Sequence, residues 1–277
     1  MSELLTFVFF ILGLLILLAL QSFLTPLPFG DTGRVRYRSF PVATFILIVI
    51  NSFVFIVWTA PNYYVDSLEA FYPYIEQVWT YGFREVFLRE HIGIGAWSTF
   101  TSTFMHADFL HLFFNMIYLW TFGRRIEDAC GPWRFLLFYL GAGMAAAVGW
   151  AALDPFNEDI PGIGASGAIS GVMGAYLVLF PGSKINCLWG IGSILRVPWA
   201  MLMDKPIWRW TIAIPSWILL IYYLISEALP SLEVIQGQGQ ITGINHLAHF
   251  FGFLAAIAIL LFVRKDLLVR YLAGRRL

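Results

Sequence analysis

The stretch that decides the fold class is residues 160–183, which read IPGIGASGAISGVMGAYLVLFPGS and contain no Asp, Glu, Lys or Arg. An α-helix of about 20 apolar residues is long enough to cross the hydrocarbon core of a bilayer. Other charge-free runs of similar length occur along the chain, at residues 4–30, 39–65, 135–153, 210–226 and 234–263. The sequence therefore predicts an all-α fold, a polytopic membrane helix bundle.

Composition and charge exclude the other broad classes. Of the 277 residues, 59% are apolar and 12% are charged, against about 25% charged residues in an average soluble domain. The 17 Lys and Arg residues balance the 17 Asp and Glu residues, so no net field attracts nucleic acid. Cys130 and Cys187 lack the spacing of a zinc ribbon and fall on the predicted cytoplasmic side. We therefore expect both cysteines to be free thiols. From the balance of charges we expect no nucleic-acid partner.

Seven transmembrane spans are predicted, at residues 4–24, 40–60, 100–123, 134–153, 164–181, 211–229 and 243–263. Residues 183–209 contain an apolar run too short to span and are predicted to be interfacial. The connection 61–99 is rich in aromatic residues, which indicates either a structure lying in the membrane interface or an aromatic belt without chemistry. We divide the chain into an amino-terminal helix with its cytoplasmic linker (1–39), a six-helix core (40–263) and a basic cytoplasmic tail (264–277).

The distribution of Lys and Arg sets the orientation, because these residues concentrate in cytoplasmic loops. With the amino terminus outside and the carboxyl terminus in the cytoplasm, 15 of the 17 basic residues are cytoplasmic and only Arg84 and Arg89 remain outside. The first span resembles an uncleaved anchor, since its apolar run is longer than that of a signal peptide and Glu3 precedes it. We expect an integral multi-pass protein of a bacterial plasma membrane.

Three of the predicted spans carry polar groups, in the segments 103–115 (TFMHADFLHLFFN), 162–171 (GIGASGAISG) and 243–252 (GINHLAHFFG). Polar groups inside a bilayer are costly, so a cluster of them indicates a functional site. At 1.5 Å rise per residue, Ser166, His249 and Asn115 lie about 27, 22 and 14 Å from the cytoplasmic edge. Three distant segments thus bring a hydroxyl, an imidazole and an amide to similar depth.

These side chains are the parts of a nucleophilic hydrolase site. A serine needs a neighbouring base, and neutral imidazole suits this role at pH 7. Attack on an amide creates an oxyanion that preorganised donors must stabilise. His111 and Asn115 are four residues apart and share one helix face, so both are candidate donors, together with the backbone N–H of Ser166. Small residues around the serine, including Gly164, Gly167 and Gly171, permit close approach of backbone and of a neighbouring helix.

Taken together, Gly164-Ala165-Ser166-Gly167, Ala248-His249 followed by Gly252, and the series His106, His111 and Asn115 resemble the rhomboid intramembrane serine proteases. Further points of similarity are Gly123 with Glu127, the run GPWRF at 131–135 and GAY at 174–176. The resemblance covers residues 40–263, and it implies a rhomboid-like six-helix catalytic core with one helix added in front.

The resemblance implies roles for individual residues. Ser166 would be the nucleophile and His249 the general base, in a dyad without a carboxylate. His111 and Asn115 would be oxyanion-hole donors, and His106 would be structural. The implied substrates are transmembrane segments of other membrane proteins in the lipid bilayer, with no metal and no cofactor. This sequence departs from many relatives at Ser170, where they place an aromatic residue that packs on the catalytic imidazole.

His246 competes with His249 for the role of base, but only His249 has Ala directly before it and Gly three residues after it. Ser170 is interpreted as a packing residue that bonds back to the preceding turn. Asp108 and Asn245 are expected to start helices.

Competing functions remain. A catalytically silent rhomboid-like protein that binds transmembrane helices would lack the serine or the histidine. A metalloenzyme built on the intramembrane histidines would require a carboxylate ligand, and the last span contains none. An aspartyl protease would require two buried Asp residues, and only Asp108 comes near. A transporter would show repeats or paired broken helices, and neither is visible.

Overall fold

The computed structural model describes residues 12–13, 26–33, 40–90, 93–155, 159–190, 201–203, 211–237, 244–263, 266, 269–270 and 273–274. The predicted first span, 4–24, lies outside these residues apart from Leu12 and Gly13, which are helical. The chain divides into two units, one formed by residues 1–33 with 182–219 and the other by residues 34–181 with 220–277.

The first unit contains a small antiparallel sheet of three strands in the order β1 (Leu27–Asp31), β2 (Lys184–Leu188) and β3 (Ile212–Pro215). The rest of the described chain is mostly helical, as expected of the predicted bundle, and this sheet is an addition that was not predicted from the sequence. Ile185 and Cys187 are fully buried while Asn186 between them is not, which is the period of two expected of a strand with one buried face. A short apolar run is ambiguous between helix and strand in sequence, so the interfacial interpretation of 183–209 missed this strand.

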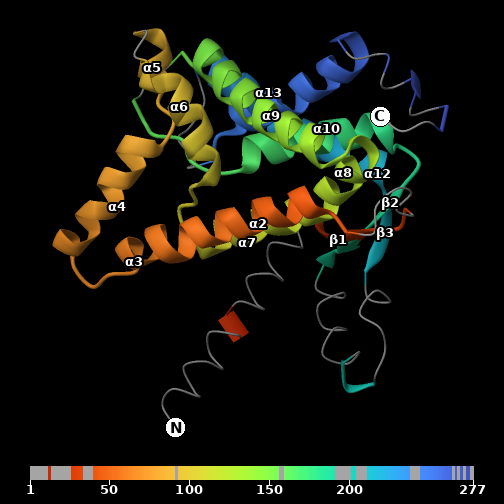
Figure 1. The fold of residues 1–277 in the computed structure, drawn as a ribbon, viewed down its shortest axis with the longest axis horizontal. Coiled ribbons are helices and arrows are strands. Elements are labelled where there is room, and N and C mark those ends of the chain that lie inside the picture. The colour runs from red at the N-terminus through yellow and green to blue at the C-terminus, as the bar shows by residue number, and fades with distance from the viewer. Residues whose placement is uncertain are drawn as a thin grey trace. The chain divides into compact units, whose positions relative to one another are not determined.

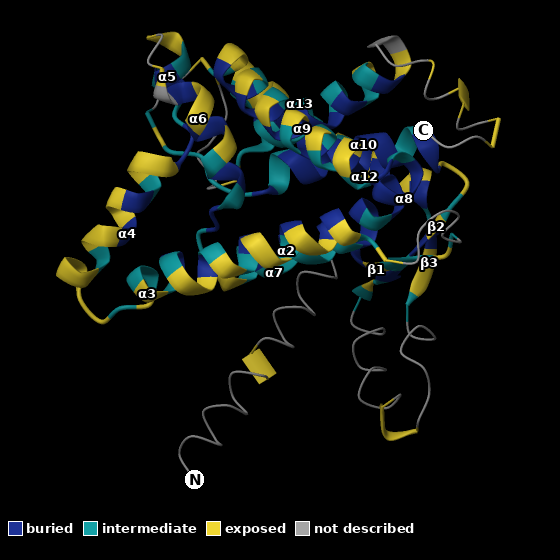
Figure 2. Cartoon of the chain, in the orientation of Figure 1, coloured by how far each residue is buried: buried dark blue, intermediate teal, exposed yellow. Residues whose placement is uncertain are grey.

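Three helices in the described part are long and apolar enough to cross a membrane: Val42–Tyr63, α9 (Pro132–Leu153) and α12 (Ser216–Ile235). The first consists of α2 (Val42–Val54), a π-helical turn and α3 (Ala60–Tyr63). These helices match the predicted second, fourth and sixth spans. Exposed apolar residues recur along α2, where yellow segments alternate with teal and dark blue ones (Figure 2), as expected of a helix with one face toward lipid.

Two shorter apolar helices correspond to the predicted fifth and seventh spans, α10 (Ser166–Leu179) and α13 (His246–Ala258). Helices α9, α10 and α13 pack against one another (Figure 1), and ten of the 14 residues of α10 are buried. A Cβ atom added to Gly252 would meet the carbonyl oxygen of Gly167, and one added to Gly171 would meet Ala142. Glycine is therefore required for this close helix contact.

The predicted third span, 100–123, is not one helix. Helix α6 (Ile94–Thr101) and a 3₁₀ turn precede a break at residues 105–108, after which α7 (Phe109–Tyr118) begins. The break occurs because the Asp108 carboxylate accepts hydrogen bonds from the N–H groups of Leu110 and His111, at 2.8 and 2.9 Å, and caps α7. Asp108 thus starts a helix as expected, and a π-helical turn then leads from α7 into α8 (Arg124–Cys130).

The connection 61–99 contains α4 (Leu68–Tyr81) and α5 (Glu85–Arg89). Its aromatic residues pack together, with the Tyr63 ring in contact with the rings of Tyr64 and Tyr74. Phe83 and Gly162 exchange two backbone hydrogen bonds of 2.9 and 2.7 Å. This bridge ties the connection to the loop that leads into α10.

Candidate active site

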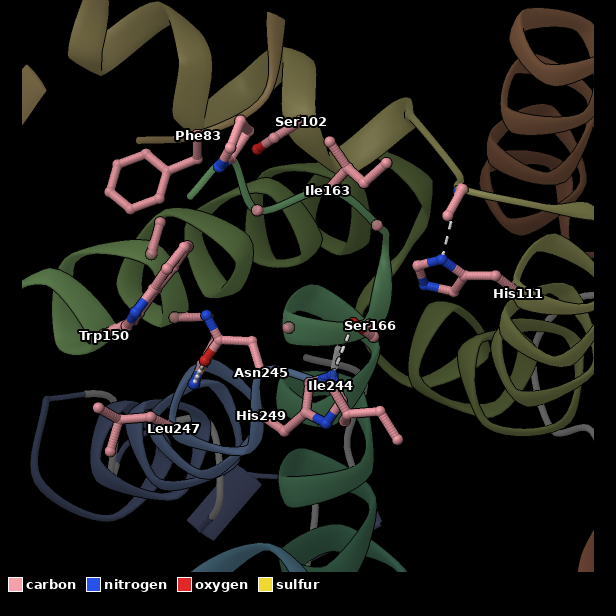
Figure 3. A pocket seen from close by; sticks show the side chains of 18 of the residues that line it. Phe83, Ser102, His111, Trp150, Ile163, Ser166, Ile244, Asn245, Leu247 and His249 are labelled. Atoms are coloured by element: carbon pink, nitrogen blue, oxygen red, sulfur yellow. Dashed lines mark hydrogen bonds between the residues drawn. The ribbon is translucent and has the colours of Figure 1, made fainter. Parts of the chain in front are cut away.

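Ser166 and His249 are in hydrogen-bond contact. Ser166 is the first residue of α10, and His249 lies in the first turn of α13, where the Asn245 side chain accepts from the N–H of Ala248 and caps the helix. The distance from His249 Nε2 to Ser166 Oγ is 2.7 Å, and Figure 3 draws this bond at the centre of the pocket. Both side chains are half-buried. Ser166 and His249, the principal residues predicted from the sequence, therefore lie close enough for proton transfer.

The other ring nitrogen of His249 faces a carboxylate that the sequence analysis did not identify. His249 Nδ1 lies 3.2 Å from Oε2 of Glu227 on α12, and His246 Nδ1 lies 2.8 Å from the same oxygen. The resemblance implied a dyad without a carboxylate, so this geometry is a departure from it. Glu227 is the only charged residue in the predicted span 211–229. This isolated charge could have identified Glu227 from the sequence, since a lone charge within a span indicates function.

A cavity of about 720 Å³ opens beside the pair and is lined by Ser166, His249, His111 and Asn115. Asn115 is buried, and among the described residues its Nδ2 has no hydrogen-bond partner. A buried amide with a free N–H is costly unless a ligand uses it. Asn115 therefore has a donor available for a negatively charged oxygen in the cavity.

His111 supplies a second donor on the same side. Its Nδ1 accepts the N–H of Ala107 at 3.4 Å, so the neutral ring carries its proton on Nε2. In Figure 3 the ring of His111 points into the pocket, and Ser166 lies between it and His249 in this view. A Cβ atom on Gly164, which has φ of +128°, would lie 2.7 Å from His111 Nε2 and 3.6 Å from Ser166 Oγ. Gly164 thus leaves room for the His111 ring, while its approach to Ser166 is an ordinary contact.

His106 packs against His111 rather than against Ser166. It is fully buried at the break before α7, and its ring contacts that of His111 edge to face at 5.1 Å between centroids. This contact limits the positions that the His111 ring can take. The placement is the one expected of a structural residue, and its role stays a prediction.

Ser170 occupies the position where many relatives have an aromatic residue. Its hydroxyl donates to the Ser166 carbonyl oxygen at 2.8 Å, as interpreted from the sequence. Because the Ser170 proton is used there, the Tyr223 hydroxyl at 2.6 Å is the donor in the second bond. Tyr223 comes from α12, and its ring lies 6.0 Å from that of Phe253 on α13. An aromatic residue from another helix therefore supports the turn that carries Ser166.

The four histidines in the described part of the chain do not form one metal site. Among the described residues, the group able to hold a metal ion is Glu227 with His246 and His249, whose ligand atoms lie within 4.8 Å of one another. His106 and His111 form a separate pair. Glu227 from α12 supplies the carboxylate ligand that the last span lacks.

Charged residues also lie near the carboxyl-terminal end of α9. Arg84 forms an ion pair with Asp159, and Arg89 lies 2.8 Å from Glu85. Burial raises the pKa of Glu85 to about 8, and the nearby Asp154 carboxylate acts in the same direction. Glu85 is therefore a carboxyl group that titrates near neutral pH.

Comparison with known proteins places the sequence in a family. The Rhomboid domain model matches residues 95–266, more than half of the chain. The putative rhomboid protease YdcA of Bacillus subtilis is 30% identical over 172 residues, which are 60% of this chain and 77% of that protein. Rhomboid protease GluP, also of Bacillus subtilis, is 36% identical over 101 residues, covering 36% of this chain and 19% of GluP.

A mitochondrial relative is similar as well. Rhomboid protein 1 of Saccharomyces cerevisiae is 28% identical over 144 residues, 51% of this chain and 37% of that protein. The chain thus spans less than two thirds of GluP and of the yeast protein. With its apolar helices, the chain is a multi-pass membrane protein, and it belongs to the rhomboid family.

Proposed function

We propose that the protein is an intramembrane serine endopeptidase, which hydrolyses peptide bonds in or near transmembrane segments of other membrane proteins. The observation that carries this proposal is the 2.7 Å contact between Ser166 Oγ and His249 Nε2, at the edge of a cavity in a membrane protein of this family. A catalytically silent member that binds transmembrane helices is the alternative, and retention of both residues argues against it.

In the proposed mechanism, His249 Nε2 takes the Ser166 proton while Ser166 Oγ attacks the carbonyl carbon of the scissile bond. The carbonyl oxygen becomes an oxyanion, for which His111 Nε2–H, Asn115 Nδ2–H and the Ser166 backbone N–H are the available donors. The last of these is at the first residue of α10, where the helix dipole favours negative charge. His249 then protonates the leaving amine, and water releases the acyl group by the same steps in reverse order.

The remaining predictions are part of the same proposal. They are an added amino-terminal span before a six-helix core at 40–263, a basic tail at 264–277, an amino terminus outside and a carboxyl terminus in the cytoplasm of a bacterial cell. No metal or cofactor is needed for the chemistry. The excess of Lys and Arg on one side supports this orientation. A reporter that is active only outside the cytoplasm tests the orientation. The reporter should be silent when fused after Leu277 and active when inserted near residue 158.

The catalytic proposal is tested by labelling with a fluorophosphonate probe and by cleavage of a transmembrane substrate. The parent protein should be labelled at Ser166 and should cleave the substrate. Ser166→Ala and His249→Ala should each abolish both, with expression and melting temperature close to those of the parent. Cleavage that persists in Ser166→Ala would remove this residue from the mechanism. A parent that is folded but neither labelled nor active would favour the silent alternative.

A further inference from the structure

Glu227 is a buried carboxylate within the predicted span 211–229, where an apolar environment makes a charged group costly. Its side chain is 11% exposed, and α12 is otherwise free of charge from Ser216 to Ser226. A carboxylate within a span needs hydrogen-bond partners, and its presence indicates a function. The partners are the two Nδ1 atoms of His246 and His249. We propose that Glu227 is a positioning residue that holds His249 in the tautomer required for proton transfer from Ser166, an inference that rests on the proposed function.

The number of protons on the His249 ring decides its tautomer. A neutral imidazole has one N–H and one lone pair, and an ionised carboxylate can only accept. With Glu227 Oε2 at 3.2 Å from Nδ1, the proton belongs on Nδ1. Nε2 then presents its lone pair to Ser166 Oγ at 2.7 Å. The opposite tautomer would turn two lone pairs toward each other and would make the serine an acceptor, which cannot start the reaction.

The same contact acts after proton transfer. Once Nε2 has taken the Ser166 proton, the ring is a cation, and the adjacent carboxylate stabilises it in a pocket of low dielectric constant. His246, with its Nδ1 at 2.8 Å, holds the carboxylate oxygen in place. Ser231 donates to the Glu227 carbonyl oxygen at 2.6 Å and fixes the turn of α12 on which the side chain stands.

The test compares Glu227→Gln with Glu233→Gln, the same change at an exposed position of the same helix. Glutamine keeps the shape of the side chain but loses its charge. We expect Glu227→Gln to lower kcat for cleavage on the order of 10²-fold, with KM nearly unchanged, because tautomer and charge act on the chemical step. Glu227→Leu, which also loses the acceptor, should lower kcat at least as much. Glu233→Gln should stay within about twofold of the parent.

A second readout separates positioning from mere stability. The ¹⁵N spectrum of labelled histidines should show His249 Nε2 as an unprotonated nitrogen in the parent and as a mixture of tautomers in Glu227→Gln, with the signal assigned by its loss in His249→Gln. Unchanged spectra and a kcat within about threefold of the parent would overturn the proposal.

This readout remains informative if the proposed function fails. A parent that is inactive would disprove the protease, whereas its His249 tautomer would still report whether Glu227 controls the ring. The same residues could instead bind a metal, so the parent is also assayed after dialysis against EDTA. Activity that disappears with EDTA and returns with Zn²⁺ would assign Glu227, His246 and His249 to a metal ion and overturn the positioning role. Activity and spectra that EDTA leaves unchanged would support it.

Discussion

Helices α10 and α12 both reach His249 on α13, but they are held in different ways. Helix α10 contacts α13 through backbone, where Gly167 and Gly252 leave no room for a side chain. Helix α12 reaches the site through polar groups, with Tyr223 bonded to Ser170 and Glu227 bonded to both histidines of α13. Only 22% of the most apolar 18-residue stretch of α12 is buried, whereas ten of the 14 residues of α10 are buried. Close backbone packing between α10 and α13 therefore sets the distance between Ser166 and His249. Hydrogen bonds from α12 set the protonation of His249.

The first test of this comparison is Gly252→Ala, for which we expect the largest effect. The added methyl group would meet the Gly167 carbonyl oxygen and push α10 from α13. Overpacking of this kind costs about 1–3 kcal/mol, and a displacement of about 1 Å at reacting groups can cost 10²-fold in rate. Melting temperature and cleavage rate should both fall.

The control is Gly141→Ala on α9, where an added Cβ meets nothing within 4 Å. This variant should be as active as the parent and slightly more stable, since Ala favours a helix over Gly by roughly 0.5–1 kcal/mol. If Gly252→Ala behaved like Gly141→Ala, the close backbone contact would not control the site.

The second prediction concerns the other side of Ser166. Gly164→Ala would place a methyl group 2.7 Å from His111 Nε2 at a backbone φ of +128°. Because the ring must move, we expect a loss of oxyanion stabilisation of roughly 10²-fold in kcat, with a smaller change in KM. Gly190→Ala also has positive φ, at +76°, but its Cβ meets nothing within 4 Å. It should therefore keep its activity, and equal losses in the two variants would contradict a specific role of Gly164.

A third, smaller effect is expected for the polar side of the comparison. Tyr223→Phe keeps the ring but removes the hydroxyl that donates to Ser170. One hydrogen bond contributes about 1 kcal/mol, so activity should fall only a few-fold, measured as the rate of fluorophosphonate labelling. Ser226→Ala removes a hydroxyl that bonds within α12, to the Tyr223 carbonyl oxygen, and should change the rate less. A loss as large as that of Gly252→Ala would mean that α12 positions Ser166 itself.

The smallest effect is expected for Glu85, a polar group outside both contacts. Its pKa in the folded state, about 8, lies above the ordinary value of 4.5, so the folded state keeps a proton that the unfolded chain has lost. The contribution of Glu85 to the free energy of unfolding therefore decreases as pH rises between these values. Glu85→Gln should remove this dependence and raise the melting temperature relative to the parent by a few degrees at pH 8, but not at pH 4.5.

Glu90→Gln, which changes an exposed carboxylate beside the same helix, is the control and should follow the parent at each pH. A melting temperature of Glu85→Gln that follows the parent from pH 4.5 to pH 8 would show that the buried carboxyl group does not titrate in this range.

The extent of prediction from sequence differs among the elements. Helix α9 agrees with the predicted span 134–153, because a long apolar run with no proline has one stable arrangement in a bilayer. The span 100–123 was predicted as one segment although Asp108 was expected to start a helix, and the structure divides it at residues 105–108. Strand β2 was missed because its hydrogen bonds go to β1 and β3, which are distant in sequence.

The sequence by itself determined that the chain is a membrane protein and which serine and histidine are paired in the rhomboid pattern, because hydrophobicity is a sum over local residues and the motifs lie within single spans. Only the tertiary structure decided that Glu227 faces His249, that Tyr223 supports Ser170 and that Asn115 is left with a free donor. These facts depend on contacts between helices, for example across 22 residues from Glu227 to His249. Such contacts are set by packing and hydrogen-bond geometry, to which no local pattern corresponds.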